Sequence, residues 1–232
     1  MRDHLLDIVK NTYGLGNIDL VKITGTAEET GIEALAEDRS VIVQAKTNGP
    51  VAEFIGTFGM PNLGKLNTIL NIPEYKENAT IQLIKETKDG KDRTTGIHFE
   101  NQHGDFKNDY RFMDGALINA KWGEKTFKGA TWQLEFAPLV VGINRFKYQA
   151  QILKEEMIFT AKMDGNNLCF SMGNPATYSG DFVFHSNVTG KNKIKLEPLM
   201  WPINNILPIL DLPGEKMMRF SNEGIMNIEV RS

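Results

Sequence analysis

Hydrophobic residues recur at helical spacing in four short segments of the chain. In the first segment, Leu5, Leu6, Val9 and Tyr13 fall on one stripe, which predicts a helix over residues 2–13. Prolines precede or begin the later segments, and a proline is well accommodated in the first turn of a helix. The three later helices are expected over residues 62–72, 138–151 and 198–209.

Alternating polarity and β-branched residues predict strands between these helices. Tight turns at Asp89-Gly90 and at residues 164–167 separate pairs of strands. Helices are few, strands are many, and the two do not alternate as in nucleotide-binding folds, so we expect an α+β protein. The strands are expected at residues 19–24, 31–36, 41–46, 51–57, 80–86, 95–100, 106–113, 131–136, 157–163, 168–172, 181–186, 216–221 and 224–230.

An internal repeat divides the chain into two similar halves. Residues 66–72 align without a gap with residues 203–209, an offset of 137 positions. The same offset places Leu6, Val9 and Lys10 on Ile143, Phe146 and Lys147. One offset that joins two separate helical segments indicates two copies of one module. Each half is therefore expected to be an antiparallel sheet layer covered on one face by two helices.

The repeat also sets the expected domain boundaries. Residues 114–130 are broken by glycines and rich in lysine, as is typical of a connecting segment. We expect an N-terminal domain over residues 1–118, a connector over 119–130 and a C-terminal domain over 131–232.

Composition favours a soluble globular protein that lacks enzymatic chemistry. Of 232 residues, 41% are hydrophobic and 24% charged, and no apolar run approaches the roughly 20 residues that span a bilayer. The single cysteine, Cys169, lies in an alternating strand and is expected to be a small buried side chain, in a reducing compartment such as the cytoplasm. No metal-ligand spacing or phosphate-binding loop occurs. We therefore expect no catalytic residue, metal or cofactor; the four histidines are His4, His98, His103 and His185.

Charge is distributed unevenly between the helices and the rest of the chain. The net charge is −3, but the four helical segments, taken as residues 2–12, 61–72, 139–151 and 198–210, sum to +3, which leaves −6 elsewhere. Such a pattern suits a protein that accepts DNA at one surface and repels it generally. An ordinary scatter of surface lysines is an equally acceptable explanation of the charge pattern alone.

Three local segments resemble the sliding clamps of DNA replication. Residues 33–44 are similar to the strand–turn–strand of the first domain of proliferating cell nuclear antigen and its archaeal relatives. Leu134-Glu135-Phe136 followed by Pro138 resembles the entry to the second domain, and Asp211-Leu212-Pro213 with the hairpin ending at Val230 resembles the clamp C-terminus. The chain most resembles the two-domain clamps of tailed phages, archaea and eukaryotes, and its size favours a phage protein.

The resemblance implies a ring around double-stranded DNA that tethers the DNA polymerase and confers processivity. Three chains would form a head-to-tail homotrimer with two helices of each domain lining the hole, and a clamp loader would place it on DNA. An edge strand near residues 106–113 would pair with an edge strand near 178–186 of the next subunit. The location would be the cytoplasm, or the host cytoplasm for a viral protein, with no membrane partner.

Two sets of site residues follow from the resemblance. Sequence-independent contacts to DNA phosphates would come from helix residues; these are Arg2, Lys10, Lys65, Arg145 and Lys147. Asp7 and an uncharged fourth helix weaken this lining. An apolar pocket would take short peptide tails of the polymerase and clamp loader; its residues are Leu35, Ile42, Leu117, Trp122, Phe127, Pro213 and Val230. Simple core packing is an alternative for Leu35 and Ile42.

One rival function belongs to a different class of protein. A β-rich phage virion or tail-tube component also assembles into rings. A pair of helices in each half distinguishes the two, because tube proteins rarely place basic helices inside the ring.

Overall fold

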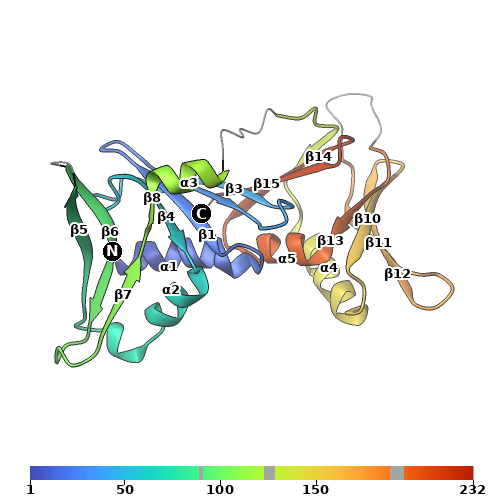
Figure 1. Ribbon diagram of the computed structural model, residues 1–232. Helices are drawn as coiled ribbons and strands as arrows, with labels where there is room; N and C mark the ends of the chain where they lie inside the picture. The colour runs from blue at the N-terminus through green and yellow to red at the C-terminus, as the bar shows by residue number, and fades with distance from the viewer. Residues whose placement is uncertain (89–90, 123–128, 189–195, 232) are drawn as a thin grey trace. The chain divides into compact units, whose positions relative to one another are not determined.

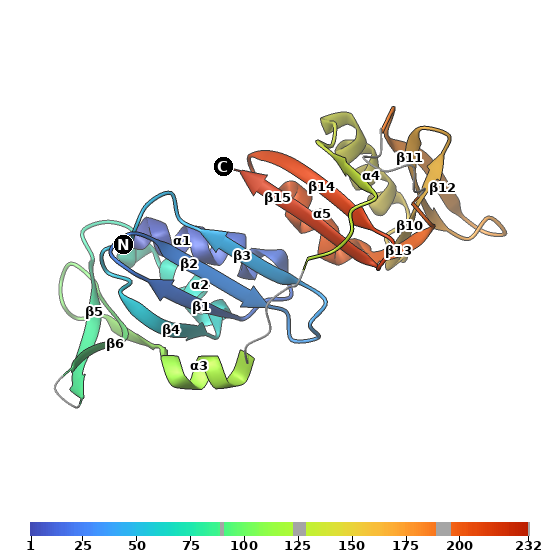
Figure 2. The same cartoon turned by 90° about the horizontal axis from the view of Figure 1, so that it is seen from above.

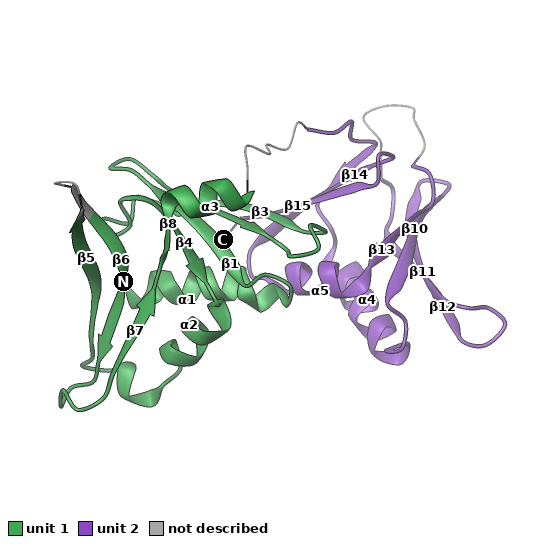
Figure 3. Ribbon diagram, in the orientation of Figure 1, with its two compact units in different colours: residues 1–126 green, residues 127–232 purple. Residues whose placement is uncertain are grey.

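The computed structural model describes residues 1–88, 91–122, 129–188 and 196–231. The chain divides into two compact units, residues 1–126 and 127–232, each of which is described by itself (Figure 3). Within the described ranges, no helix is long and apolar enough to cross a membrane.

The described residues of unit 1 form a five-stranded sheet, a three-stranded sheet and three α-helices (Figure 1). The larger sheet has the order β3-β2-β1-β4-β8 and the smaller one the order β5-β6-β7. All pairings in both sheets are antiparallel. The elements are α1 (Arg2–Asn11), η1 (Tyr13–Leu15), β1 (Leu20–Gly25), β2 (Thr30–Leu35), β3 (Ile42–Lys46), β4 (Gly56–Pro61), α2 (Leu63–Leu70), η2 (Pro73–Tyr75), β5 (Thr80–Lys88), β6 (Lys91–Glu100), β7 (Lys107–Arg111), β8 (Met113–Asp114) and α3 (Gly115–Trp122).

In unit 2, the part of the chain that the structure describes forms a four-stranded sheet, a three-stranded sheet and two α-helices. The larger sheet has the order β12-β11-β10-β13 and the smaller one the order β15-β14-β9, again antiparallel throughout. The elements are β9 (Leu134–Phe136), α4 (Val140–Ile152), β10 (Ile158–Asp164), β11 (Asn167–Gly173), β12 (Ser179–His185), β13 (Leu199–Pro202), α5 (Ile203–Asp211), β14 (Glu215–Ser221) and β15 (Ile225–Arg231).

The two units repeat one topology, which confirms the expected α+β fold with duplicated modules. In each unit, four strands of the larger sheet follow the first helix in the sequence. Across the sheet, the third of these strands pairs with the second, the second with the first, and the first with the fourth. In each unit the second helix follows the fourth strand directly, and a hairpin comes next, β5–β6 or β14–β15. Each unit has two sheets where one layer was expected, and β7, β8 and α3 have no counterpart in the described part of unit 2.

Helices α1 and α2 run antiparallel to each other beneath the larger sheet of unit 1 (Figures 1 and 2). At one end, Arg2 Nη2 donates a 2.9 Å hydrogen bond to the carbonyl of Leu70, the last residue of α2. At the other end, the ring of Tyr13 lies against Gly64 in the first turn of α2. Leu5, Ile8 and Val9 on α1 are buried, but Tyr13 is exposed, so the expected stripe is rotated toward Ile8.

The core of unit 2 is built from phenylalanines on α4 and the larger sheet. Phe146 of α4 lies within aromatic contact distance of Phe159, Phe170 and Phe184, with ring centroids 4.7, 5.3 and 6.4 Å away. Phe170 and Phe184 stack on neighbouring strands, with centroids 4.2 Å apart. These four rings are fully buried or nearly so, and aromatic pairs of this kind stabilise a core beyond their burial alone.

Three expectations about elements were wrong. The last helix does not begin at residue 198, because residues 199–202 form β13 and the helix begins at Ile203. Trp201 precedes a proline, which disfavours helical geometry and leaves the residue extended opposite Phe159. The strand expected at 51–57 lies at 56–61, and the segment expected as an irregular connector begins with helix α3. The turn at Asp89-Gly90 lies outside the described residues.

Candidate functional site

The exposed side of the helix pair in unit 1 carries two basic residues. Lys10 lies in the last turn of α1 and Lys65 in the first turn of α2, and both are exposed. Neither forms an ion pair with another residue in the described part of the chain. The contact between Tyr13 and Gly64 brings the ends of the helices that carry these lysines together. Both ammonium groups are therefore available to an anionic partner.

Arg2, which was expected to contact DNA, is engaged within the chain. Its Nη2 donates to the carbonyl of Leu70, and its Nε atom is buried. A cation beside the final carbonyls of a helix compensates the negative end of the helix dipole. Arg2 thus joins α1 to α2 and holds the antiparallel pair together.

The two expected DNA contacts on α4 are also engaged within unit 2. Arg145 Nη1 donates a 3.0 Å hydrogen bond to the carbonyl of Val183 on β12. Lys147 forms an ion pair with Asp211, which ends α5. Burial, followed by repulsion from Lys147, lowers the pKa of the nearby Lys216, whose Nζ donates to the carbonyl of Leu212 at 2.6 Å.

The extension of α5 to Asp211 changes the charge of the helical surface. The helices α1, α2, α4 and α5 hold the five basic residues Arg2, Lys10, Lys65, Arg145 and Lys147 and the three acidic residues Asp3, Asp7 and Asp211, a net charge of +2. The segments drawn from the sequence ended before Asp211 and gave +3. The four helices together are thus weakly basic, with a net charge of +1 in each unit. Lys10 and Lys65 of unit 1 have no acidic partner among the described residues, and Arg145 of unit 2 keeps its charge, because it bonds a neutral carbonyl.

Each unit has a sheet that ends in an open strand. β7 ends the order β5-β6-β7, and β12 ends the larger sheet of unit 2. Within the described residues, neither strand has a partner on its outer side. These strands lie within the segments expected to join neighbouring subunits. An unpaired edge is a template for another strand, so both are candidate contact surfaces.

The residues expected to form a peptide pocket lie in separate places. Leu35 and Ile42 are cross-strand partners on β2 and β3; Leu35 is half-buried and Ile42 is 60% exposed. Leu117 and Trp122 belong to α3, at the opposite edge of the same sheet (Figure 2). Pro213 and Val230 lie in unit 2, and Phe127 is outside the described residues. Within unit 1, the structure therefore separates Leu35 and Ile42 from Leu117 and Trp122.

A charged ladder on the smaller sheet of unit 1 surrounds His98. Its Nδ1 lies 2.7 Å from Asp109 Oδ1, and its Nε2 lies 3.2 Å from Glu100 Oε2. The bond to Asp109, and after it the bond to Glu100, raises the pKa of His98. The bond between His98 and Glu100 also lowers the pKa of Glu100. Asp109 comes from the neighbouring strand, opposite His98, so this contact could not be read from the local sequence.

Burial shifts the pKa values of Cys169 and His185 in unit 2. Cys169 is buried, which confirms the expectation for this residue, and burial raises the pKa of its thiol. The ring of His185 lies 4.6 Å from that of Phe136, and burial lowers the pKa of this imidazole. Among the described residues, no group of three or more His, Cys, Asp or Glu side chains could hold a metal ion.

Sequence reasoning missed an apolar surface on α4. Val140, Val141, Tyr148 and Ile152 are between 51% and 73% exposed. The signal was present, because residues 141, 148 and 152 follow helical spacing on a face distinct from that of Ile143 and Phe146. The helix face with Ile143 and Phe146 already supplies the contact of α4 with the core. The apolar residues at 141, 148 and 152 therefore could not be explained by core packing.

The comparisons with known proteins agree with this architecture. No protein-family model matches the sequence, and no curated protein does. Among solved structures, the chain is similar to PCNA, the proliferating cell nuclear antigen, of Thermococcus kodakaraensis, with a TM-score of 0.64 and 14% identity. The match covers 100% of this chain and 91% of that one. The chain therefore has the fold of a DNA sliding clamp.

Proposed function

We propose that this protein is a sliding clamp that encircles double-stranded DNA and tethers a DNA polymerase. One observation carries the proposal: both units repeat one sheet order, and each places its helix pair at equivalent points of that order. Repeated units of this kind suit a ring with pseudo-equivalent segments. The clamp has no covalent chemistry to perform, because its task is topological.

The ring would consist of three copies joined head to tail. The open edge of β7 on one copy would pair with the open edge of β12 on the next. Such a heterologous contact must close on itself to avoid forming a filament, and three copies with two units each give a closed ring. Pairing would also cover two sheet edges that otherwise favour aggregation.

The contact with DNA would be weak and independent of sequence. Lys10 and Lys65 would supply the main attraction to phosphates, because Lys147 is paired with Asp211 and Arg2 is held against the end of α2. Arg145 would add its charge, since its partner is a neutral carbonyl. Phosphate contacts carry no sequence information and are weakened by salt, so a lining with few of them permits sliding. The acidic Asp3 and Asp7 on α1 further limit the attraction.

The tether would act by raising the effective concentration of the polymerase at the primer end. Once a closed ring surrounds DNA, an enzyme bound to it rebinds before it diffuses away. Exposed apolar residues are the expected anchors for short partner peptides, and Ile42 beside Leu35 is the best candidate in unit 1. The clamp loader would use the same type of contact to open and place the ring.

Topological retention on DNA tests the proposal. The protein is loaded with its clamp loader, or under crowding, onto nicked circular DNA, and the complex is isolated by gel filtration in high salt. We expect the protein to stay on circular DNA, to leave after one restriction cut, and to lengthen polymerase products on the circle. Equal release from circular and linear DNA, or assembly into tubes without DNA, would contradict the clamp and favour a structural virion protein.

A further inference from the structure

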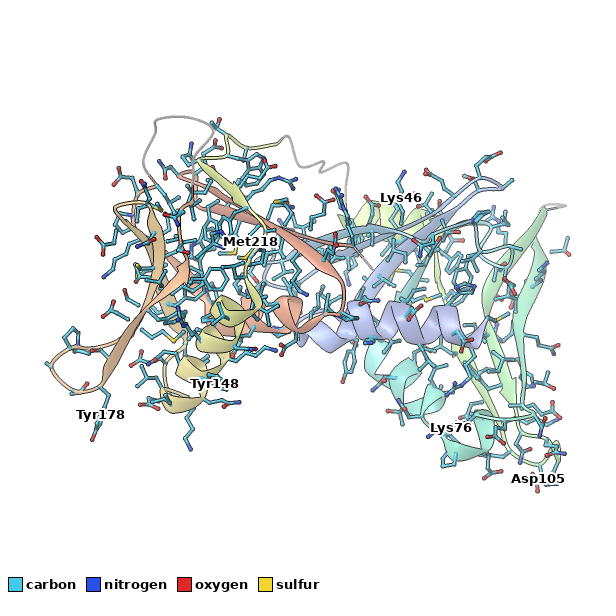
Figure 4. The ribbon with its side chains drawn as sticks, turned by 180° about the vertical axis from the view of Figure 1, so that it is seen from behind. Lys46, Lys76, Asp105, Tyr148, Tyr178 and Met218 are labelled. Carbon is cyan, nitrogen blue, oxygen red and sulfur yellow. The ribbon has the colours of Figure 1, made fainter. Side chains whose placement is uncertain are left out.

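The chain leaves the edge strand β3 of unit 1 through an exposed turn at residues 47–50. Figure 4 shows Lys46, the last residue of β3, pointing away from the body of the unit directly before this turn. Asn48, Gly49 and Pro50 are all exposed. The turn contains the one Asn-Gly dipeptide of the 232-residue sequence. Exposed turns are open to solvent, so groups in them can react while the protein stays folded.

Two neighbouring groups in this turn have no hydrogen-bond partner. In the described part of the chain, neither the Asn48 side chain nor the Gly49 N–H forms a hydrogen bond. A Cβ placed on Gly49 would meet no atom within 4 Å, so no neighbour crowds its backbone. Glycine also visits more backbone conformations than other residues, including those that turn its nitrogen toward the preceding side chain. The Asn48 carboxamide can therefore approach the Gly49 nitrogen without displacing a partner.

Hydrogen bonds to Thr30 hold both ends of the turn and leave its middle free. The Thr47 N–H donates to the Thr30 carbonyl at 3.1 Å, and the Val51 N–H donates to the Thr30 hydroxyl oxygen at 2.9 Å. Thr30 itself is fully buried on β2. The Thr47 hydroxyl also donates to the Gly49 carbonyl at 2.5 Å. The main chain between the two bonds to Thr30 therefore has a fixed span.

We propose that Asn48 is a site of spontaneous covalent modification, through attack of the Gly49 nitrogen on its side chain. The nitrogen forms a bond to Cγ, and the side-chain amide leaves as ammonia with the proton from Gly49, which closes a cyclic imide. Water then opens the imide. Cleavage of the new nitrogen–Cγ bond gives aspartate, and cleavage of the bond to the main-chain carbonyl gives isoaspartate. The reaction needs only water, and it does not depend on the proposed ring.

The two products differ in their effect on unit 1. Both add a negative charge directly after Lys46, whose ammonium pairs with Glu29 at 2.6 Å. Only isoaspartate routes the main chain through Cβ, which lengthens the path between the two bonds to Thr30. The Val51 N–H is buried, so loss of its bond to Thr30 would leave a donor without an acceptor. We therefore expect isoaspartate to lower the stability of unit 1 and aspartate to leave it nearly unchanged.

Mass spectrometry of the ageing protein tests the modification. The folded protein is incubated at slightly alkaline pH and physiological temperature, and samples are digested with trypsin, which releases residues 47–65 as one peptide. That peptide also contains Asn62, which is exposed but precedes leucine and serves as the internal reference. Fragmentation should show the mass increase of an amide-to-acid conversion at Asn48 well before any at Asn62. A sample digested without incubation corrects for conversion during digestion.

Gly49→Ala is the matched variant for the mechanism. Gly49 does not have a positive φ, and its Cβ direction is open, so alanine should leave the fold and the melting temperature unchanged. The added methyl group restricts the backbone and hinders attack by the nitrogen, so conversion at Asn48 should slow several-fold. An Asn48 that converts no faster than Asn62, or equally fast in Gly49→Ala, would overturn the proposal.

A comparison with Asn48→Asp separates the added charge from the lengthened main chain. This variant carries the charge of both products on an ordinary backbone, so it should melt with the unmodified protein. The isoaspartate fraction of the aged protein, isolated by ion exchange, should melt at a lower temperature. Equal melting of isoaspartate and unmodified protein would overturn the expected effect on unit 1, and a lowered melting temperature in Asn48→Asp would assign that effect to charge.

Discussion

Lys147 of α4 forms an ion pair with Asp211, the residue that ends α5. The pair joins the two helices of unit 2 and neutralises a lysine that would otherwise add to a basic surface. Both side chains are partly exposed, so the pair contributes at most about 1 kcal/mol to stability. Its main consequence is electrostatic: of the three lysines on α1, α2 and α4, only Lys10 and Lys65 have no acidic partner among the described residues.

The salt dependence of DNA binding should distinguish Lys10 and Lys65, which have no acidic partner, from Lys147, which is paired with Asp211. Lys10→Ala and Lys65→Ala should each reduce the slope of log affinity against log salt by about one, because each removes one phosphate contact. Lys147→Ala should change the slope much less. Fluorescence anisotropy with short duplex DNA at several salt concentrations measures these slopes, and equal losses for all three variants would contradict this distinction.

Asp211→Asn should strengthen DNA binding. The change releases Lys147 and removes an acid from a helix C-terminus, where a negative charge is unfavourable. We expect the salt slope to increase by up to about one, with little change in melting temperature. Glu29→Gln is a matched control, since Glu29 also pairs with a lysine, Lys46, but lies on none of the helices. An increase in both variants would indicate a nonspecific effect of net charge.

Gly142→Ala should destabilise unit 2 strongly. The added methyl group would lie 2.0 Å from a backbone oxygen of β12, which cannot move without disturbing the sheet. Overpacking of this kind costs about 1–3 kcal/mol, measured by urea unfolding. Gly180→Ala is the control in the same helix–strand contact, because there the new methyl group meets only the movable end of Gln149. A similar cost for both variants would mean that the close approach at Gly142 is not fixed.

Asp114 should be required for the stability of α3. Its Oδ1 accepts a 2.8 Å hydrogen bond from the backbone N–H of Ala116 in the first turn. Asp114→Ala should cost about 1 kcal/mol, whereas Asp114→Asn keeps the acceptor and loses only the exposed pair with Arg93. The free energy of unfolding is measured for both variants. Equal losses in Asp114→Ala and Asp114→Asn would mean that the ion pair with Arg93, and not the hydrogen bond to Ala116, stabilises the helix.

His98 and His185 should make the free energy of unfolding depend on pH in opposite directions. Bonds to Asp109 and Glu100 raise the pKa of His98 above its ordinary value of 6.5, so its contribution is fully present below pH 6.5 and is lost as pH rises through the folded-state pKa. Burial lowers the pKa of His185, so its contribution is present above pH 6.5 and is lost as pH falls through the lowered pKa.

Substitutions at these histidines should each flatten one side of the pH profile. His98→Gln should abolish the loss of stability on the alkaline side of pH 6.5, and His185→Phe should reduce the loss on the acid side. Urea unfolding at intervals from pH 5 to pH 8 measures both effects, with each variant serving as the control for the other. A profile shifted uniformly in either variant would contradict these assignments.

The duplicated fold was predictable because its signals are local or periodic. The helical stripes around Val9 and Phe146 and the alternating strands depend on neighbours in sequence, and one offset related the two halves. Helix α3 was missed because flanking glycines and lysines resemble a loop. Packing against a strand distant in sequence also stabilises this helix, because Ile118 is buried against Gly59 of β4.

The candidate site was less predictable, because its charges pair over long sequence distances. Nothing near Lys147 in the sequence points to Asp211, and nothing near Arg145 points to the Val183 carbonyl. Similarly, Ile42 and Leu117 were both expected in one pocket, but the sheet order places β3, which carries Ile42, and α3, which carries Leu117, at opposite edges. Residue type and spacing identify a charged helix, but only the fold shows which charges are engaged.

Electron microscopy of the purified protein at micromolar concentration tests the central claim most directly. The account predicts closed rings of three copies, a mass of three times 26.1 kDa, around a central hole wide enough for duplex DNA. Isolated single chains, open filaments or stacked tubes would contradict it.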